Sequence, residues 1–241
     1  VIAFDADDTL WVNETYFRDA EKQFAKLLSF YETENKIDQE LFRMEMDNLP
    51  LYGYGVKAFT LSMVESALEL SNYNISTKTI EAILNIGKDM LNKPVELLEG
   101  VEEVLKVLSK KYRLILATKG DLLDQEQKLE KSGLTDYFHH IEVLSDKKEA
   151  NYSKLLNHLD INPSEFLMIG NSLKSDILPL VNIKAHAIHV PFHTTWAHEE
   201  VSASQSNGKG YKTVTGLRDI LKFLNSKLIF VIKILKKFNS L

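Results

Sequence analysis

Several things are missing from this 241-residue sequence, and each absence excludes a class of protein. There is no cysteine, which excludes a disulfide framework, a thiolate metal site and a cysteine nucleophile. Lys and Arg number 29 against 34 Asp and Glu, so the chain lacks the basic excess expected of a nucleic-acid-binding protein. No apolar run approaches the roughly 20 residues of a membrane span, and no signal-peptide pattern opens the sequence. We therefore expect a cytoplasmic globular protein with neither a nucleic-acid partner nor a membrane span.

The most informative segment is the opening of the chain, where an apolar run leads directly into acidic residues. Residues 1–4 have the composition of a buried parallel strand, and Asp5, Asp7, Asp8 and Thr9 follow at once. Ligands bind where the strands of an open α/β sheet end. Three carboxylates this close repel one another unless a bound cation or a shared proton offsets their charge. The segment is therefore either a metal-assisted catalytic centre or an unfavourable cluster of charges without a function. Because the first residue already lies in the predicted strand, we expect further residues upstream.

The rest of the chain shows two kinds of sequence pattern. Residues 13–93 are helical in character, with a break at Gly53 and Gly55. From Pro94 onward, helical patterns alternate with strand-like runs at 113–118, 141–145, 166–170 and 186–190, as in a parallel sheet. We predict an α/β fold with a Rossmann-like parallel sheet as its core (1–12 and 94–225), an inserted α-helical cap (13–93) and a C-terminal helical extension (226–241). A basic amphipathic helix in this extension could lie on a membrane or dock a partner, but we expect it to pack on the core or on a second subunit. We expect a monomer or a homodimer.

Polar residues end each of these strand-like runs. After Asp5, the next runs end in Thr118-Lys119-Gly120, in Ser145-Asp146-Lys147-Lys148, and in Gly170-Asn171-Ser172-Leu173-Lys174-Ser175-Asp176. The carboxyl ends of parallel strands meet at one edge of a sheet, so these hydroxyls, ammonium groups and carboxylates gather there. This combination suits a phosphate group and a divalent metal together.

Taken in order, these motifs resemble those of the haloacid dehalogenase-like hydrolase superfamily, and most closely its magnesium-dependent phosphatases with a helical cap. The resemblance rests on Asp5-Ala6-Asp7-Asp8-Thr9, Thr118, Lys147 and the segment from Gly170 to Asp176. It spans the whole predicted core, whereas the predicted cap contains no motif that can be matched. The resemblance implies a Rossmann-like core, a phosphatase activity and Mg²⁺ as cofactor.

The resemblance also implies roles for individual residues. Asp5 would be the nucleophile that forms an aspartyl-phosphate, and Asp7 would protonate the leaving oxygen and then activate water. Thr118, Lys119 and Lys147 would bind the substrate phosphate, and Lys147 would also hold Asp5 in place. Of the adjacent pair Lys147 and Lys148, we choose the first because it ends the strand-like run.

The metal ligands implied by the resemblance are Asp5, the backbone carbonyl of Asp7, and Asp176. The family's usual acid at the position of Asn171 is an amide here, so we expect weakened or rearranged coordination that still includes Asn171. Asp8 is open to two readings, a capping role in the turn or a role behind the metal. Thr9 is expected to fix the turn.

The choice of reaction depends on Asp7. Dehalogenases of this superfamily lack an acid at this position, so Asp7 favours hydrolysis of a phosphate ester. A phosphosugar mutase of the same superfamily remains an alternative, as does a catalytically silent binding module. We expect the substrate to be a small phosphorylated metabolite. We also expect the cap, including residues 52–55, to set specificity by closing over it.

Overall fold

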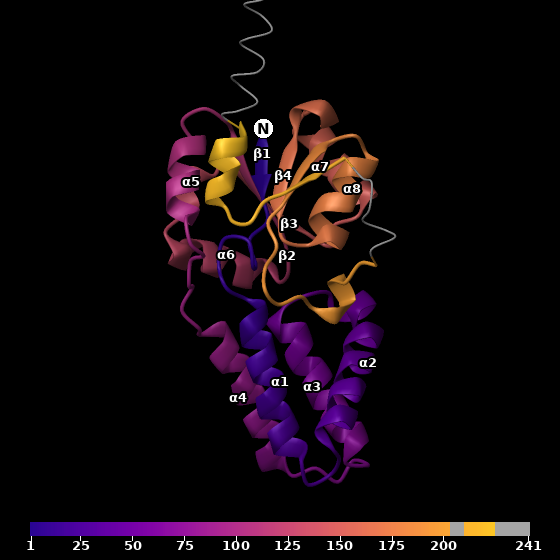
Figure 1. The fold of residues 1–241 in the computed structure, drawn as a ribbon. Helices are drawn as coiled ribbons and strands as arrows, with labels where there is room; N and C mark the ends of the chain where they lie inside the picture. The colour runs from indigo at the N-terminus through magenta and orange to yellow at the C-terminus, as the bar shows by residue number, and fades with distance from the viewer. Residues whose placement is uncertain (203–209, 225–241) are drawn as a thin grey trace, which may run out of the picture.

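The computed structural model describes residues 1–202 and 210–224 (Figure 1). Its centre is a six-stranded sheet in which each neighbouring pair of strands is parallel, in the order β3-β2-β1-β4-β5-β6. The strands are β1 (Ile2–Phe4), β2 (Leu114–Lys119), β3 (His140–Leu144), β4 (Leu167–Gly170), β5 (His186–His189) and β6 (Lys212–Thr213). The predicted α/β fold is confirmed. The short sixth strand was not predicted.

Helices cover both faces of this sheet, because alternate residues of each buried strand face opposite sides. Ile2 and Phe4 of β1 belong to one apolar cluster, and Ala3 belongs to the other. The covering helices are α5 (Val101–Leu108), α6 (Leu122–Ser132), α7 (Glu149–His158) and α8 (Leu178–Asn182), the last preceded by a π-helical turn (Leu173–Ile177). The first cluster includes residues of α5 and α6, and the second includes residues of α7 and α8 (Figure 1). Burial of both faces explains why the strands read as continuous apolar runs.

Four helices lie between β1 and α5 and form a separate bundle beyond the carboxyl ends of the strands (Figure 1). They have their own apolar cluster, in which Phe24, Leu28, Ile37 and Met63 are fully buried. The helices are α1 (Glu14–Leu28), α2 (Glu34–Tyr52), α3 (Val56–Leu70) and α4 (Thr77–Leu91). The bundle therefore stands over the edge of the sheet at which ligands bind in such folds.

The turn between α2 and α3 is built from glycines. Gly53 and Gly55 have φ angles of 72° and 108°, which side chains other than glycine rarely adopt. A Cβ atom on Gly55 would lie 3.1 Å from the backbone nitrogen of Asp121, so the turn also packs closely on the sheet domain. The break expected at these glycines is where the helices separate.

Two connections join the bundle to the sheet, and they are hydrogen-bonded to each other. The amide of Val12 donates to the carbonyl of Glu96 at 2.9 Å, and the amide of Leu98 donates to the carbonyl of Leu10 at 2.9 Å. The bundle is thus attached through a paired double connection. The described residues contain no helix long and apolar enough to cross a membrane. The predicted extension at 226–241 lies outside the described residues.

Candidate active site

The carboxyl ends of β1, β3 and β4 place a buried ammonium between two buried carboxylates. Lys147 Nζ donates to Asp5 Oδ1, and to Asp176 Oδ1 at 2.7 Å. The side chains of Lys147, Asp5 and Asp176 are 2%, 9% and 1% exposed. The neighbouring Lys148 is instead 75% exposed and pairs with Asp146 at 2.7 Å. Of the two candidate lysines, the structure therefore brings only Lys147 to Asp5.

Burial dominates the electrostatics of Asp5. The pKa of its carboxyl is raised from 3.8 to about 7. Removal from water is the largest cause, the Lys147 ammonium opposes it, and the charge of Asp176 adds to the increase. One ammonium thus faces two buried carboxylates. Additional positive charge at this place would favour the ionised form of Asp5, which is the form that attacks as a nucleophile.

The free oxygens of these carboxylates have partners as well. The Thr9 hydroxyl lies 3.2 Å from both Asp5 Oδ2 and Asn171 Oδ1, so it links the first motif to the loop after β4. The amide of Ser172 donates to Asp176 Oδ2 at 3.0 Å. This packing requires glycine at position 170, because a Cβ atom there would lie 2.4 Å from Asp176 Oδ2. Asp176 is therefore locked against the strand end, facing Lys147.

Asp7 is held by three donors that the sequence analysis missed. Its Oδ1 accepts from Trp11 Nε1 at 2.8 Å and from Lys128 Nζ at 2.5 Å, and its Oδ2 accepts from Gln125 Nε2 at 2.8 Å. Gln125 and Lys128 are three residues apart on α6 and so lie on the same helix face. The three-residue spacing of Gln125 and Lys128, on a helix that starts just after Thr118, was the sequence signal that could have indicated these partners of Asp7.

The carboxylate of Asp8 lies at the start of α1 and binds its first free amides. The φ angle of Asp8 is 60°, and its carboxylate accepts hydrogen bonds from the amides of Asn13 at 2.9 Å and Glu14 at 3.0 Å. Burial raises the pKa of Asp8 to about 8, against the effect of these amides. Of the two roles considered for Asp8, these hydrogen bonds correspond to the capping role.

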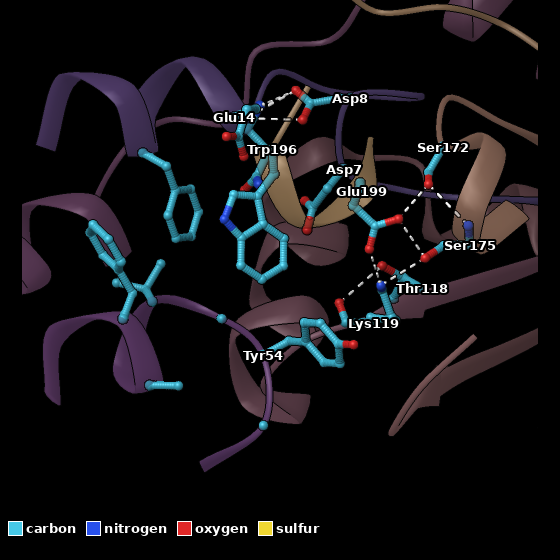
Figure 2. A pocket seen from close by; sticks show the side chains of 18 of the residues that line it. Asp7, Asp8, Glu14, Tyr54, Thr118, Lys119, Ser172, Ser175, Trp196 and Glu199 are labelled. Atoms are coloured by element: carbon cyan, nitrogen blue, oxygen red, sulfur yellow. Dashed lines mark hydrogen bonds and ion pairs between the residues drawn. The ribbon is translucent and has the colours of Figure 1, made fainter. Parts of the chain in front are cut away.

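Around Thr118 and Lys119, the structure reveals a second ion pair (Figure 2). Thr118 is 1% exposed at the end of β2. Lys119 Nζ lies 2.6 Å from Glu199 Oε1, 2.9 Å from Ser175 Oγ and 4.2 Å from the centre of the Tyr54 ring. Lys119 was predicted to bind phosphate, and here its charge is already paired. Glu199 was not predicted, since it lies in a region without regular periodicity.

These residues line one cavity of about 170 Å³ between the strand ends and the helical bundle. The strand ends and their loops contribute the predicted site residues: Asp5, Asp7, Thr118, Lys119, Lys147, Asn171 and Asp176. The bundle contributes acidic and apolar side chains: Glu14, Phe17, Glu21, Glu45, Leu49, Tyr54, Val56 and Phe59. Tyr52 does not line this cavity and donates to Glu65 at 2.9 Å. All the predicted site residues are thus brought together.

The bundle side of the cavity holds more carboxylates than cations. Burial, together with the charges of Glu21 and Glu14, raises the pKa of Glu45 to about 8. Burial also raises the pKa of Glu14 to about 7, although Arg18 pairs with it at 2.6 Å. The residues of the bundle that line the cavity include no Lys or Arg, so this wall offers an anion no cation.

The residues near Asp5 fit a hard divalent cation such as Mg²⁺. Among the residues that the structure describes, no three His, Asp or Glu side chains form a ready ligand group. The side-chain donors are the carboxylates of Asp5 and Asp176 and the amide oxygen of Asn171. Mg²⁺ is usually held in proteins by one or two carboxylates together with carbonyls and waters, so this oxygen-only set suits it. The pairing of one ammonium with two buried carboxylates leaves negative charge for the cation to offset.

Comparison with known proteins identifies the class. A model of the haloacid dehalogenase-like hydrolase family matches residues 1–183, and the chain belongs to this family, as its motifs predicted. Human N-acylneuraminate-9-phosphatase is 26% identical over 187 residues, which cover 73% of this chain and 75% of the human protein. The rat enzyme is 25% identical over the same shares of the two chains.

Solved structures show the same architecture. A haloacid dehalogenase-like family hydrolase from Xanthomonas campestris is 38% identical, with a TM-score of 0.81 over 94% of this chain and 91% of that one. A protein described as a predicted phosphoglycolate phosphatase from Haemophilus somnus superposes with a TM-score of 0.61 at 18% identity, covering 93% of this chain and 97% of that one. The protein is therefore a hydrolase of this family.

Proposed function

We propose that this protein is a Mg²⁺-dependent phosphatase that hydrolyses a small-molecule phosphate monoester through an aspartyl-phosphate on Asp5. The observation that carries the proposal is the buried Asp5–Lys147–Asp176 cluster at the base of the cavity. The phosphatase relatives favour hydrolysis over the mutase alternative. The presence of every expected site residue disfavours a silent binding module.

In the first step, Asp5 attacks the phosphorus atom of the bound ester. Lys147 holds the Asp5 carboxylate in place and attracts the phosphoryl oxygens, while the Thr118 hydroxyl donates to one of them. When bound, Mg²⁺ supplies positive charge that offsets the repulsion between the carboxylate and the phosphate. Asp5, Asp176 and Asn171, with the backbone carbonyl of Asp7, would hold it.

Asp7 handles the proton in both steps. It protonates the leaving oxygen as the aspartyl-phosphate forms, and it then takes a proton from the water that hydrolyses this intermediate. Trp11, Gln125 and Lys128 fix its carboxyl group from the side of the sheet domain. Their hydrogen bonds limit the directions in which the carboxyl group can turn toward substrate.

The α1–α4 bundle acts as a cap. The two connections, which pair near Trp11 and Leu97, would form the hinge about which it closes. Closure would exclude bulk water while the phosphoryl group is transferred. Cap residues such as Tyr54 and Phe59 line the far side of the cavity and would contact the part of the substrate that leaves.

The test is hydrolysis of an aryl phosphate with and without Mg²⁺, by the native protein and by Asp5→Asn. The substitution keeps the shape of the side chain and removes the nucleophile. The proposal expects Mg²⁺-dependent hydrolysis that is lost in the variant. Activity that survives both the substitution and the removal of metal would refute it. A folded protein that binds Mg²⁺ without hydrolysing the ester would favour the mutase or the binding module.

A further inference from the structure

One carboxylate near the reaction site has no role in the proposed hydrolysis. Glu199 lies in a 3₁₀ turn (Ala197–Glu199) between β5 and β6, far in sequence from the motifs. Its Oε1 pairs with Lys119 Nζ at 2.6 Å, and its Oε2 accepts from Ser175 Oγ at 2.6 Å and from Ser172 Oγ. The side chain is 12% exposed. Figure 2 shows it between Lys119 and the two serines. A single carboxylate thus satisfies one ammonium and two hydroxyls.

The three donors form the kind of group that binds an anion. An ammonium and two hydroxyls converge on one point. Lys119 is the last residue of β2, and the two serines follow β4. Burial alone would raise the pKa of Glu199, but Lys119 and the two serine hydroxyls lower it to about 2. The carboxylate is therefore ionised over the whole range of pH in which the protein is expected to work.

This anion site adjoins the phosphate site. Ser175 directly precedes Asp176, and Lys119 directly follows Thr118. Ser172, Ser175, Lys119 and Glu199 line the same cavity as Asp5. A second anionic group on a substrate would find its natural partners here, next to the phosphoryl group.

We propose that Glu199 is a specificity-determining residue, which fills the anion site formed by Lys119, Ser172 and Ser175 and thereby excludes substrates with a second anionic group close to the phosphate. The inference rests on the proposed phosphatase function and narrows its substrate class to esters whose alcohol part is neutral or cationic near the phosphate. Such an alcohol leaves the contacts of Glu199 intact. A carboxylate in the same place must displace Glu199 or be repelled by it.

The opposite wall of the cavity offers no cation to a second anionic group. Glu14 and Glu45 line it from the cap, and Arg18, which pairs with Glu14 at 2.6 Å and with Glu21 at 2.8 Å, is not among the residues that line the cavity. Next to Glu199, Trp196 contacts Tyr54 edge to face, with ring centres 6.2 Å apart. The turn that carries Glu199 therefore also joins the cap loop to the core, and it offers a substrate aromatic surface in place of a cation.

The test compares two esters that differ at one carbon, glycerol 3-phosphate and 3-phosphoglycerate, in which a hydroxymethyl group is replaced by a carboxylate. The native protein should prefer the neutral ester in kcat/KM by about tenfold or more, since like-charge juxtaposition costs several kcal/mol. Glu199→Gln keeps the shape of the side chain and frees Lys119. It should raise the ratio of kcat/KM for 3-phosphoglycerate to kcat/KM for glycerol 3-phosphate about tenfold.

Two further variants make the result specific. Glu200→Gln removes one negative charge from the adjacent, exposed position and should leave the ratio unchanged. Adding Lys119→Gln to Glu199→Gln should abolish the gain, because the cation that receives the second anion is then missing. A loss of packing around Glu199 would not produce this pattern.

The outcomes separate the two proposals. If the native protein hydrolyses an aryl phosphate but prefers 3-phosphoglycerate, or if Glu199→Gln leaves the ratio unchanged, the role of Glu199 is refuted while the phosphatase function stands. If no ester is hydrolysed, the proposed function itself fails. If Glu199→Gln does not fold, the role of Glu199 is tested on the native protein, by using the two esters as competitive inhibitors of aryl phosphate hydrolysis. Glycerol 3-phosphate should bind about tenfold more tightly than 3-phosphoglycerate, and the reverse order would overturn the inference.

Discussion

Replacing Lys147 with Met removes the only ammonium that pairs with Asp5 and Asp176 among the described residues. Met has a similar length and no charge, so the change mainly deletes the cation. Both carboxylates stay buried, and neither gains a new counter-ion. Position 148 offers a matched control, because Lys148→Met deletes an exposed lysine of the same loop.

The expected cost follows from burial. Breaking a buried ion pair by removing one partner costs about 3–5 kcal/mol, because the remaining charge is left uncompensated. An exposed pair such as Lys148–Asp146 contributes about 0–1 kcal/mol. Lys147→Met should therefore lose several times more unfolding free energy than Lys148→Met.

The loss should also depend on pH. Burial already raises the pKa of Asp5 to about 7 from 3.8, and without Lys147 it rises further. The folded variant then binds a proton that the unfolded chain releases, so its stability falls as pH increases through the interval between the two pKa values. Protonation of Asp5 at acidic pH relieves part of the penalty.

Urea unfolding without added divalent metal, at about pH 5.5 and about pH 8.5, measures these differences. We expect Lys147→Met to be destabilised at both, and more at the higher pH. Equal stabilities of Lys147→Met and Lys148→Met at the higher pH would refute the reasoning. It would mean that the two carboxylates are not ionised together beside Lys147.

Three further predictions concern other parts of the cavity. Gly170→Ala would push a Cβ atom to 2.4 Å from Asp176, and we expect a loss of about 1–3 kcal/mol in thermal unfolding. Glu45→Gln removes a carboxyl whose pKa rises from 4.5 to about 8 on folding. In urea titrations at each pH, the variant should be about 4–5 kcal/mol more stable than the native protein at about pH 8.5 and equally stable near pH 4.5. Trp11→Phe keeps the ring but deletes the hydrogen bond to Asp7 at 2.8 Å, and we expect about a fivefold fall in kcat with little change in KM. The first prediction is contradicted if Gly170→Ala melts at the same temperature as the native protein. The second is contradicted if the stability difference between Glu45→Gln and the native protein is the same at both pH values, and the third if Trp11→Phe has the native kcat.

The sheet was predictable because its signals are local. Each central strand is a short apolar run that ends in polar residues, and burial on both faces makes that run continuous. The sixth strand escaped prediction for the same reason. It consists of Lys212 and Thr213, both exposed, and it exists only through its pairing with β5.

The site residues were found through motifs at strand ends, whereas their partners were not. Gln125 and Lys128 reach Asp7 only because of the way α6 packs on the sheet, which periodicity alone does not show. Glu199 meets Lys119 across 80 residues of sequence, from a loop with no repeating pattern. Contacts of this kind depend on tertiary packing. The three-residue spacing of Gln125 and Lys128 is a weak local signal for theirs, and Glu199 has none. The cap and the roles of the site residues stay predictions.

The central claim is that Asp5 becomes phosphorylated, and direct detection of that modification tests it most closely. Asp7→Asn should favour accumulation, because an aryl leaving group departs without a proton whereas the water that hydrolyses the intermediate still needs a base. The variant would be mixed with an aryl phosphate and Mg²⁺, quenched in acid, digested and analysed by mass spectrometry. The account predicts a phosphoryl group on the peptide containing Asp5, and none when Asp5 is also replaced by Asn. A phosphoryl group on another residue, or full turnover by Asp5→Asn, would contradict it.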